Sequence, residues 1–286
     1  MPETAAEKNI AVLCNELAGA GRSVQLAATI DLLLTGKGIP HMQFTRNWPS
    51  DFSSFTDLFL VGGDGTLNYF INHYPGTRLP LVIFKGGTGN DFHWLLYGDI
   101  TPESQLEKVL ETAARPIDTG ECNGRYFING VGAGFEGEVA KALTARKKLP
   151  GNSSYLLTIL QKIFSYRSQE YRIRSGNQVI TGKKLLVDIC NGRRAGGGFQ
   201  VAPVARADDG CLDLVVAGAL GSLKRLFYLP VIEKGKHLSL SFIQHYAVKT
   251  ATIESDKRIQ YHLDGEYGEA DKLDIRVHKA ALLFRY

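Results

Sequence analysis

The chain has 286 residues, 44% of them hydrophobic, which suits one large domain or two ordinary ones. Its net charge of +4 is too small to predict nucleic-acid binding, but it is compatible with an anionic substrate or a membrane surface. The four cysteines are far apart, so neither a zinc ribbon nor a disulfide framework is predicted, and we expect a cytoplasmic protein. No signal-peptide pattern and no membrane-spanning apolar run is found.

The first 120 residues alternate between strand and helix patterns. Apolar periodicity predicts a helix that ends near Gly36, and a second helix over 101–115 with Thr101 as its cap and Pro102 in its first turn. Short apolar runs predict four strands, over 10–14, 41–45, 58–61 and 81–84. This alternation is typical of an α/β domain with a parallel, doubly wound sheet.

Strand patterns dominate the rest of the chain. Residues 171–180 form a hairpin pattern with Gly176 and Asn177 at its turn, and helical patterns cover 136–148 and 153–167. Further strands are predicted over 184–192, 199–205, 211–218, 247–255, 258–266 and 272–286. The second half is therefore expected to be an antiparallel β-sandwich or barrel with inserted helices.

Three strand exits in the first half are rich in glycine: "NELAGAGRS" (15–23), "GGDGTLN" (62–68) and "GGTGND" (86–91). In an open parallel sheet these turns gather at the carboxyl ends of the strands, where ligands bind. Glycine lets backbone N–H groups approach a phosphate, although tight packing also requires glycine. One turn alone favours packing slightly, whereas three favour a nucleotide site. The dinucleotide and P-loop patterns are both absent.

Polar residues in two of these turns are candidate ligands. Asp64 is either a turn former or part of a metal–nucleotide site. Thr66 and Asn68 are candidate hydrogen-bond donors to phosphate oxygens, and so are Thr88 and Asn90 in the next turn.

Two acidic clusters lie in the second half. Asp208, Asp209 and Asp213 surround Gly210, and a surface hairpin turn and a site for a hard cation such as Mg²⁺ or Ca²⁺ explain this spacing equally well. The segment "YHLDGEYG" places Asp264 and Glu266 around another glycine. This is either a hairpin turn or a general base with a supporting acid.

Taken in order, "GGDGTLN", "GGTGNDF", "YFINGVGAGFEGEVA", "NGRRAGGGFQVAPVARADDGCLDL" and "HLDGE" resemble the bacterial branch of the diacylglycerol kinase-type lipid kinases, a family related to sphingosine and ceramide kinases. The first motif alone is shared with NAD kinases and phosphofructokinases, whereas the ordered set is highly specific. The resemblance implies an ATP-binding α/β domain over 1–120 and a β-sandwich domain over 121–286, with the active site in the cleft. It leaves open whether the last strand returns toward the first domain.

The resemblance also implies roles for individual residues. Asp264 would take the proton from the lipid hydroxyl, with Glu266 beside it. A structural Mg²⁺, or Ca²⁺ in its place, would bind at Asp208, Asp213 and the carbonyl of Cys211. ATP would contact the second strand and the two turns, at Thr45, Gly62, Gly63, Asp64, Gly65, Thr66, Leu67, Asn68, Thr88 and Asn90.

The chain departs from the family pattern at several positions. Lys85 replaces a proline, His93 and Trp94 replace Ala-Arg, and Glu136 stands where Asp is usual. The first turn also lacks the usual proline and serine. None of these changes removes the proposed base, but Lys85 and Trp94 bear on which acceptor is used.

The function expected from the sequence is an ATP-dependent lipid kinase that uses Mg²⁺. A soluble-metabolite kinase such as an NAD kinase and a non-catalytic nucleotide-binding regulator are the alternatives. The expected partner is a lipid at the inner face of a membrane. Residues 153–167, or 222–230 with Lys224 and Arg225, are candidates for contact with anionic lipid, although packing of 153–167 against the sheet is favoured. The lipid acceptor and a homodimer are left open.

Overall fold

The computed structural model describes residues 8–145 and 153–286, with the backbone alone for 153–155. The chain divides into two compact units. Unit 1 contains Met1–Ile117 and Ala280–Tyr286, and unit 2 contains Asp118–Lys279.

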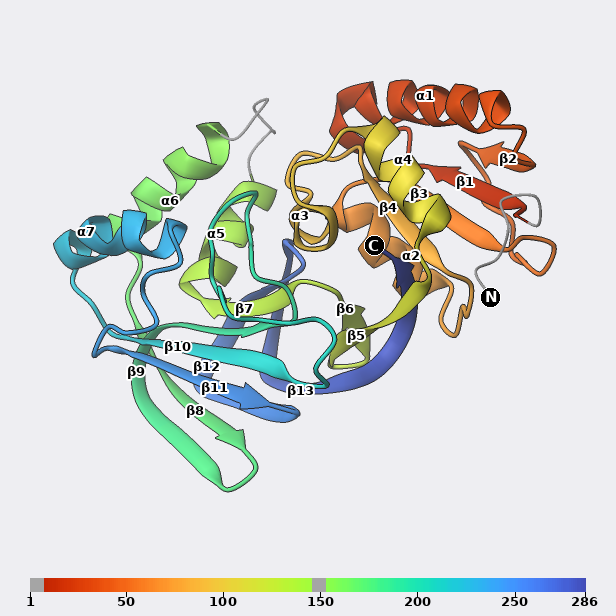
Figure 1. Cartoon of the computed structure of the whole chain (residues 1–286). Coiled ribbons are helices and arrows are strands. Elements are labelled where there is room, and N and C mark those ends of the chain that lie inside the picture. Colours follow the sequence, from red (N-terminus) through yellow and green to blue (C-terminus); the bar gives the residue numbers. More distant parts are fainter. Residues whose placement is uncertain (1–7, 146–152) are drawn as a thin grey trace. The chain divides into compact units, whose positions relative to one another are not determined.

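Unit 1 is built on four parallel strands in the order β4-β3-β1-β2. These are β1 (Ile10–Cys14), β2 (His41–Phe44), β3 (Asp57–Gly62) and β4 (Leu81–Lys85). Every residue of β1 and β3 is buried, because helices cover both faces of these strands. Helices α1 (Arg22–Gly36) and α4 (Pro102–Glu111) pack against each other, and α2 (Asp64–His73) lies across the sheet from α1 (Figure 1). The four predicted strands are confirmed.

Local signals account for the helix ends of unit 1. The Thr101 hydroxyl accepts a hydrogen bond from the Ser104 N–H (3.3 Å), and Pro102 is the first residue of α4, so the predicted cap is confirmed. The short 3₁₀ turn at Ala18–Gly21 and helices α2 and α3 (Asp91–Tyr97) begin within the three glycine-rich segments.

The last residues of the chain complete unit 1. The end of β13 (Glu266–Arg285) pairs with β4 through Phe284 and Leu81. Phe284 is fully buried and packs edge-on against Phe92, with ring centroids 5.6 Å apart. The Arg285 guanidinium pairs with the buried carboxylate of Asp57.

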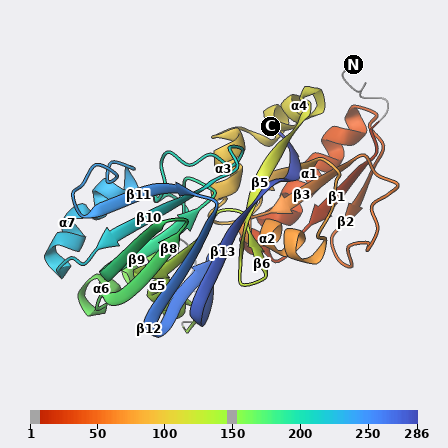
Figure 2. The same ribbon diagram turned by 90° about the horizontal axis from the view of Figure 1, so that it is seen from below.

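Unit 2 is an antiparallel sheet in the order β11-β10-β9-β7-β12-β13. Its strands are β7 (Gly130–Gly134), β9 (Gln178–Cys190), β10 (Leu212–Gly218), β11 (Ile243–Val248), β12 (Thr250–Leu263) and β13; β5 (Ala114–Cys122), β6 (Arg125–Phe127) and β8 (Gln169–Ser175) pair beside this path. The predicted turn at Gly176 and Asn177 joins β8 to β9 and is confirmed. Helices α5 (Phe135–Thr144), α6 (Ser153–Ser165) and α7 (Ser222–Glu233) lie on one face of the sheet (Figures 1 and 2).

Three predictions for the second half need correction. Residues 199–205 are not a strand, since they make only one isolated bridge, between Phe199 and Ala195, and Pro203 has no N–H to donate to a ladder. The strand predicted over 247–255 is divided, because β11 ends at Val248 and β12 begins at Thr250. The helix predicted over 136–148 ends at Thr144, and residues 146–148 lie outside the described part of the chain.

Candidate active site

The glycine-rich turns of unit 1 pack backbone against backbone. A side chain on Gly87 would approach the Cα of Gly63 to 2.4 Å, and one on Gly63 would meet the Cα of Gly87 at 2.9 Å. Gly19 has a φ of +59°, and its missing Cβ would lie 2.2 Å from the carbonyl oxygen of Gly86. No other residue fits these contacts, so packing alone requires glycine here.

Two side chains fix the geometry of these turns. The Asp64 carboxylate accepts hydrogen bonds from the backbone N–H groups of Asp91 (2.9 Å) and Phe92 (2.8 Å) at the start of α3. The Asn90 side chain accepts from the N–H of Gly87 and donates to its carbonyl, both at 2.9 Å, and closes the second turn on itself. Asp64 therefore joins two turns, which is a positioning role that its sequence motif did not reveal.

The structure divides the predicted nucleotide residues into buried and accessible groups. Leu67 is fully buried in the core, and Asn68 is buried with its backbone and side-chain oxygens facing Asn72. The buried Thr66 hydroxyl accepts a hydrogen bond from Asn15. The side chains of Leu67 and Asn68 thus face the protein interior. The predicted residues not buried by neighbours are Thr45, Asp64, Gly65, Thr88 and Asn90.

The amino end of α2 adds a physical reason for anion binding in this region. Gly63 is its N-cap, without a side chain to satisfy the first N–H groups, and the helix runs for ten residues. The helix dipole favours negative charge at this end. Gly65, in the first turn, is exposed and has open space around it.

Asp264 of unit 2 sits in the two-residue turn between β12 and β13. It adopts a left-handed conformation, with φ of +48°. Its Oδ1 accepts from the N–H groups of Asn129 (2.8 Å) and Gly130 (2.9 Å), and its Oδ2 accepts from the N–H of Ile128 (2.8 Å). The carboxylate is thereby held rigidly at the start of β7.

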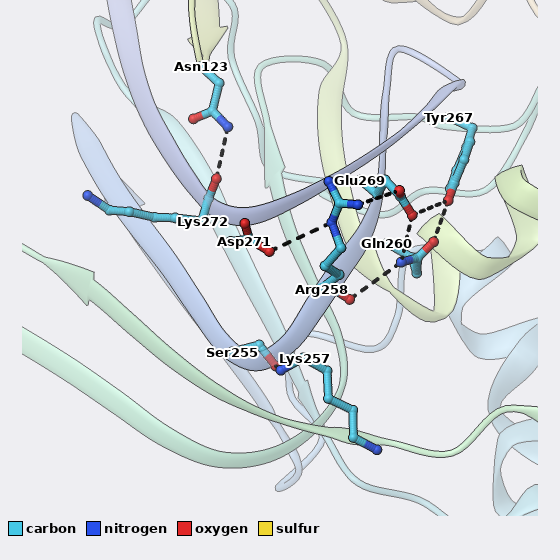
Figure 3. A network of polar contacts seen from close by, with 9 residues as sticks. All are labelled: Asn123, Ser255, Lys257, Arg258, Gln260, Tyr267, Glu269, Asp271 and Lys272. Atoms are coloured by element: carbon cyan, nitrogen blue, oxygen red, sulfur yellow. Dashed lines mark hydrogen bonds and ion pairs between the residues drawn. The ribbon is translucent and has the colours of Figure 1, made fainter.

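A polar network holds the β12–β13 hairpin that carries Asp264 (Figure 3). Arg258 donates to Glu269 (2.9 Å), and Gln260 donates to the second oxygen of Glu269 (3.4 Å). The Tyr267 hydroxyl bonds both Gln260 and Glu269. These cross-strand contacts fix the register that places Asp264 at the turn.

The second predicted catalytic residue has a different environment. Glu266 is exposed, and its carboxylate pairs with the Arg125 guanidinium at 2.9 Å. Both side chains are more than half exposed, so the pair contributes little to stability.

The predicted metal ligands do not converge in the described residues. Asp208 pairs with Arg206 (3.2 Å), and Asp213 lies 2.6 Å from the Nε2 of His245. The Cys211 N–H donates to Asp209, which closes a local turn. Across 8–145 and 153–286, no three His, Cys, Asp or Glu side chains gather as metal ligands would. The predicted site also uses the carbonyl of Cys211, so it stays a prediction.

A narrow apolar pocket lies in unit 2, between the sheet and helices α5, α6 and α7. Its cavity volume is about 80 Å³. Its apolar lining includes Val139, Ile159, Ile163, Leu186, Val215, Ala217, Leu229 and Ile243.

One end of this pocket is polar and is built on a single row across the sheet. His262 of β12 and Asp188 of β9 both pair with Gly132 of β7, so their side chains lie on the same face. A side chain on Gly132 would lie 2.5 Å from both the Glu136 and the His262 side chains and 2.9 Å from the Asp188 Oδ1. Glu136 and Asp188 line the pocket.

The polar end is joined to the Asp264 turn by hydrogen bonds. The Gly265 N–H donates to Nδ1 of His262 (3.2 Å), which assigns the ring proton to Nε2. That Nε2 lies 2.8 Å from the Glu136 carboxylate. Gly265 follows Asp264 directly in the turn, so the pocket and the predicted base share one connected framework.

Burial changes the protonation of two groups in the pocket. It raises the pKa of the Asp188 carboxyl well above its ordinary value, and the negative charge of Glu136 raises it further. Burial also lowers the pKa of His237 below its ordinary value. Asp188 thus favours its protonated form, and His237 favours its neutral form.

Sequence reasoning missed two polar groups that line the pocket, Asp188 and His237, and also His262, which contacts the pocket residue Glu136. Asp188 stands in the otherwise apolar run "LLVDIC", and a lone carboxylate in a buried strand is a usable signal. Lys85 and His93 turn out to have partners of their own. Lys85 pairs with Asp99 (2.9 Å), and the buried His93 pairs with Gln105 (3.0 Å).

Lys224 and Arg225 were candidates for contact with anionic lipid. The structure does not support this role for Arg225. The Arg225 guanidinium is buried and donates to the carbonyls of Leu220, Ile163 and Tyr166, so it is held inside unit 2. None of the helices in the described residues has the length and apolar character needed to cross a bilayer.

Comparisons with known proteins cover both units. The diacylglycerol kinase catalytic domain family matches residues 9–122, and the YegS C-terminal NAD kinase beta sandwich-like domain family matches residues 129–283. A Pseudomonas aeruginosa protein named "Probable lipid kinase YegS-like" is 32% identical over 240 residues, which is 80% of this chain and 76% of that protein. A Bacillus subtilis protein named diacylglycerol kinase is 28% identical over 221 residues, 75% of this chain and 72% of that protein.

Solved structures share the fold. The crystal structure of a diacylglycerol kinase from Bacillus anthracis matches with a TM-score of 0.73 and 21% identity, over 98% of this chain and 97% of the other. An NAD kinase from Archaeoglobus fulgidus in complex with ATP matches with a TM-score of 0.55 and 13% identity, over 97% and 93% of the two chains.

Proposed function

Because this chain belongs to the diacylglycerol kinase-type family of lipid kinases, we propose that it transfers the γ-phosphoryl group of ATP to a hydroxyl group of a membrane lipid. The observation that carries the lipid acceptor is the pocket of unit 2. It is narrow and apolar along its walls, and it is polar at one end. An acyl or alkyl chain matches the walls, and a hydroxyl-bearing headgroup matches the polar end.

Unit 1 would hold the nucleotide. Phosphoryl transfer requires positioning and charge stabilisation more than covalent chemistry. The backbone N–H groups at Gly63 and Gly65, and the amino end of α2, would face phosphate oxygens, with Thr88 as a hydroxyl donor. Asp64 would act indirectly, since its carboxylate already positions α3. Mg²⁺ would enter with the triphosphate and neutralise its charge.

Asp264 would accept the proton of the lipid hydroxyl as the new bond to phosphorus forms. Its position supports this role. Gly130, which bonds the Asp264 carboxylate, lies two residues from Gly132 on the same strand, roughly 7 Å away at the rise of a β-strand. A lipid with its headgroup at the polar end of the pocket would therefore bring a hydroxyl near Asp264.

The outer faces of two helices support contact with a membrane. α6 exposes Leu156, Leu157 and Phe164, and α7 exposes Leu223 and Phe227. The two helices pack together, and both also line the pocket through their inner faces. We propose that this outer surface, the α6–α7 surface, lies against the membrane interface from which the lipid enters.

The proposed function is tested with ATP labelled at the γ-phosphate and a panel of acceptors. Diacylglycerol, phosphatidylglycerol and ceramide would be offered in mixed micelles, and NAD in solution. The expected result is label on at least one lipid and none on NAD. Label on NAD alone would identify a soluble-metabolite kinase, and nucleotide binding without transfer would identify a regulator.

A further inference from the structure

Two asparagine-glycine pairs lie against each other in unit 2. One is Asn129-Gly130, at the end of "YFING", and the other is Asn191-Gly192, at the start of "NGRRAGGGF". The backbone N–H groups of Asn191 (2.8 Å) and Gly192 (2.9 Å) both donate to the carbonyl oxygen of Asn129. A side chain on Gly192 would lie 2.7 Å from the Asn129 Oδ1, so the absence of a Cβ permits this close approach.

The side chain of Asn191 acts as a hydrogen-bond donor. It is fully buried, and its Nδ2 donates to the carbonyl oxygens of Ile128 (2.9 Å) and Asp118 (3.0 Å). Its Oδ1 has no hydrogen-bond partner among the residues that the structure describes. A buried oxygen without a partner lowers stability, so stability alone does not account for an asparagine at this position.

The donors of Asn191 bond the same backbone segment that holds Asp264, at its carbonyl groups. The C=O of Ile128 and the N–H of Asn129 belong to one peptide unit, and the C=O of Asn129 and the N–H of Gly130 belong to the next. A trans peptide unit directs its C=O and N–H to opposite sides. Asn191 therefore donates to the carbonyl side of both units, while the Asp264 Oδ1 accepts from their N–H groups at 2.8 and 2.9 Å.

We infer that Asn191 is a positioning residue for the proposed base, Asp264, and that it acts through these two peptide units. This rests on the proposed kinase function and adds a residue to its proton-transfer step. A hydrogen bond to a carbonyl polarises the peptide unit and strengthens the hydrogen bond that its N–H donates. The Asp264 carboxylate is therefore more strongly stabilised and more firmly oriented than by its own three donors alone.

The other titratable groups around the Asp264 turn are kept when Asn191 is replaced. They are Cys190 of β9, His262 of β12, Glu266 of β13 and Arg125 of β6. The Asn191 side chain donates to backbone carbonyls and not to these groups. A change in the pKa of Asp264 on replacing Asn191 would therefore report the loss of the amide donors.

The test measures the carboxyl pKa of Asp264 in the full-length protein, without ATP or lipid. Protein labelled with carbon-13 at its aspartate carboxyl groups would be titrated by NMR, and Asp264→Asn would identify the Asp264 signal by its loss. In Asn191→Ala we expect this pKa to rise by about half a unit, because the N–H donors to the carboxylate are less polarised.

Initial rates with ATP and lipid provide a second readout. In Asn191→Ala, kcat should fall about ten- to a hundredfold while the KM for ATP is unchanged, since a misplaced base slows the chemical step and leaves nucleotide binding intact. If Asn191→Ala does not fold, Asn191→Ser takes its place. Its hydroxyl supplies one donor where the amide supplies two, so a smaller rise in the pKa is expected.

Gln105→Ala is the matched control. Gln105 is a buried amide of α4 whose Nε2 donates to the carbonyl of Ile83 (2.9 Å), so its loss should lower stability and leave the pKa of Asp264 as in wild type. An unchanged Asp264 pKa in the folded Asn191 variant, or an equal rise in Gln105→Ala, would overturn the inference.

The two readouts separate this inference from the proposed function. If the pKa of Asp264 rises in Asn191→Ala but the wild type phosphorylates no lipid, the kinase function fails and the action of Asn191 on Asp264 stands. If lipid is phosphorylated and Asn191→Ala keeps the wild-type kcat, the kinase function stands and the positioning role fails.

Discussion

At the scale of single residues, the central group is Asp264. Three backbone N–H donors hold its carboxylate, so this residue has both a structural and a proposed chemical role. In Asp264→Asn, the amide NH₂ would face at least one of these donors. We expect the free energy of unfolding to fall by about 1–3 kcal/mol, and lipid phosphorylation to fall by about 10²–10⁴-fold.

Urea unfolding and initial rates measured on the same preparation would separate these two effects. Asp264→Glu is the companion variant, since it keeps the charge and moves the carboxylate by one methylene. Turnover at the wild-type rate in folded Asp264→Asn would remove Asp264 from the chemistry.

A second prediction at this scale concerns the effect of Asp188 on the free energy of unfolding. Its pKa in the folded protein is raised well above 3.8, so the folded state holds a proton that the unfolded state has released. Stability from this group is therefore lost as pH rises above about 4, by at most about 1.4 kcal/mol per pH unit until the folded pKa is passed. Relative to wild type, Asp188→Asn should become steadily more stable in chemical unfolding as the pH rises above about 4, until the folded pKa of Asp188 is passed. A constant difference would contradict the burial argument.

Some of these residues could be identified from the sequence and others could not, for a physical reason. Asp264 and the glycine turns stand in contiguous motifs, so their spacing identifies them. Asp188 and His262 lie together only because β9, β7 and β12 pair in one register, and His237 comes from the segment between α7 and β11. The carboxylates of the turn at 208–213 are close in sequence, and in the structure Asp208 pairs with Arg206 and Asp213 with His245.

At the scale of elements, the glycine turns of unit 1 form one packed assembly. Gly87→Ala would bring a Cβ within 2.4 Å of the Gly63 Cα, and backbone cannot yield as a flexible side chain can. We expect a loss of about 1–3 kcal/mol in the free energy of unfolding and weaker nucleotide binding, because the turns separate.

Gly36→Ala is the matched control for this variant. Gly36 ends α1 with open space around it, so alanine is expected to be neutral or slightly stabilising. Differential scanning fluorimetry with and without ATP would compare the two. A Gly87→Ala protein with unchanged stability and ATP response would show that the two turns are not tightly packed.

The α6–α7 surface makes a prediction of its own. Leu223 and Phe227 are 78% and 71% exposed, and neither lines the pocket. Replacing both with serine should weaken flotation with phosphatidylglycerol vesicles at low salt, because apolar side chains on the interface are removed. Val179→Ser, at an exposed apolar position on β9, is the control and should float as wild type. Equal flotation of both variants would exclude this surface as the membrane contact.

Helices and strands with a clear apolar periodicity could be predicted from the sequence. Elements whose sequence patterns conflict could not. The buried strands of unit 1 are short apolar runs, and α4 has both its cap and its first-turn proline. α7 was not predicted, since Pro230 lies inside it and a proline usually interrupts a helix. The segment 199–205 has strand composition but packs as a loop, with Ala202 and Ala205 buried.

At the scale of the whole molecule, two separate segments of the chain form unit 1. Arg285 meets Asp57 across 228 positions in the sequence, and no local pattern predicts such a contact. The resemblance to a kinase family left open a return of the last strand toward the first domain. Periodicity alone gave no indication of it. Fold class and the glycine-rich turns therefore followed from the sequence, while the pocket of unit 2 required the structure.

The central claim is that this protein phosphorylates a lipid. The most direct measurement is to incubate it with Mg²⁺, γ-labelled ATP and a total bacterial lipid extract, and then to separate the organic and aqueous phases. We predict protein-dependent label in the organic phase that saturates with added lipid and is lost in Asp264→Asn. Label confined to the aqueous phase, at every lipid concentration, would contradict the claim.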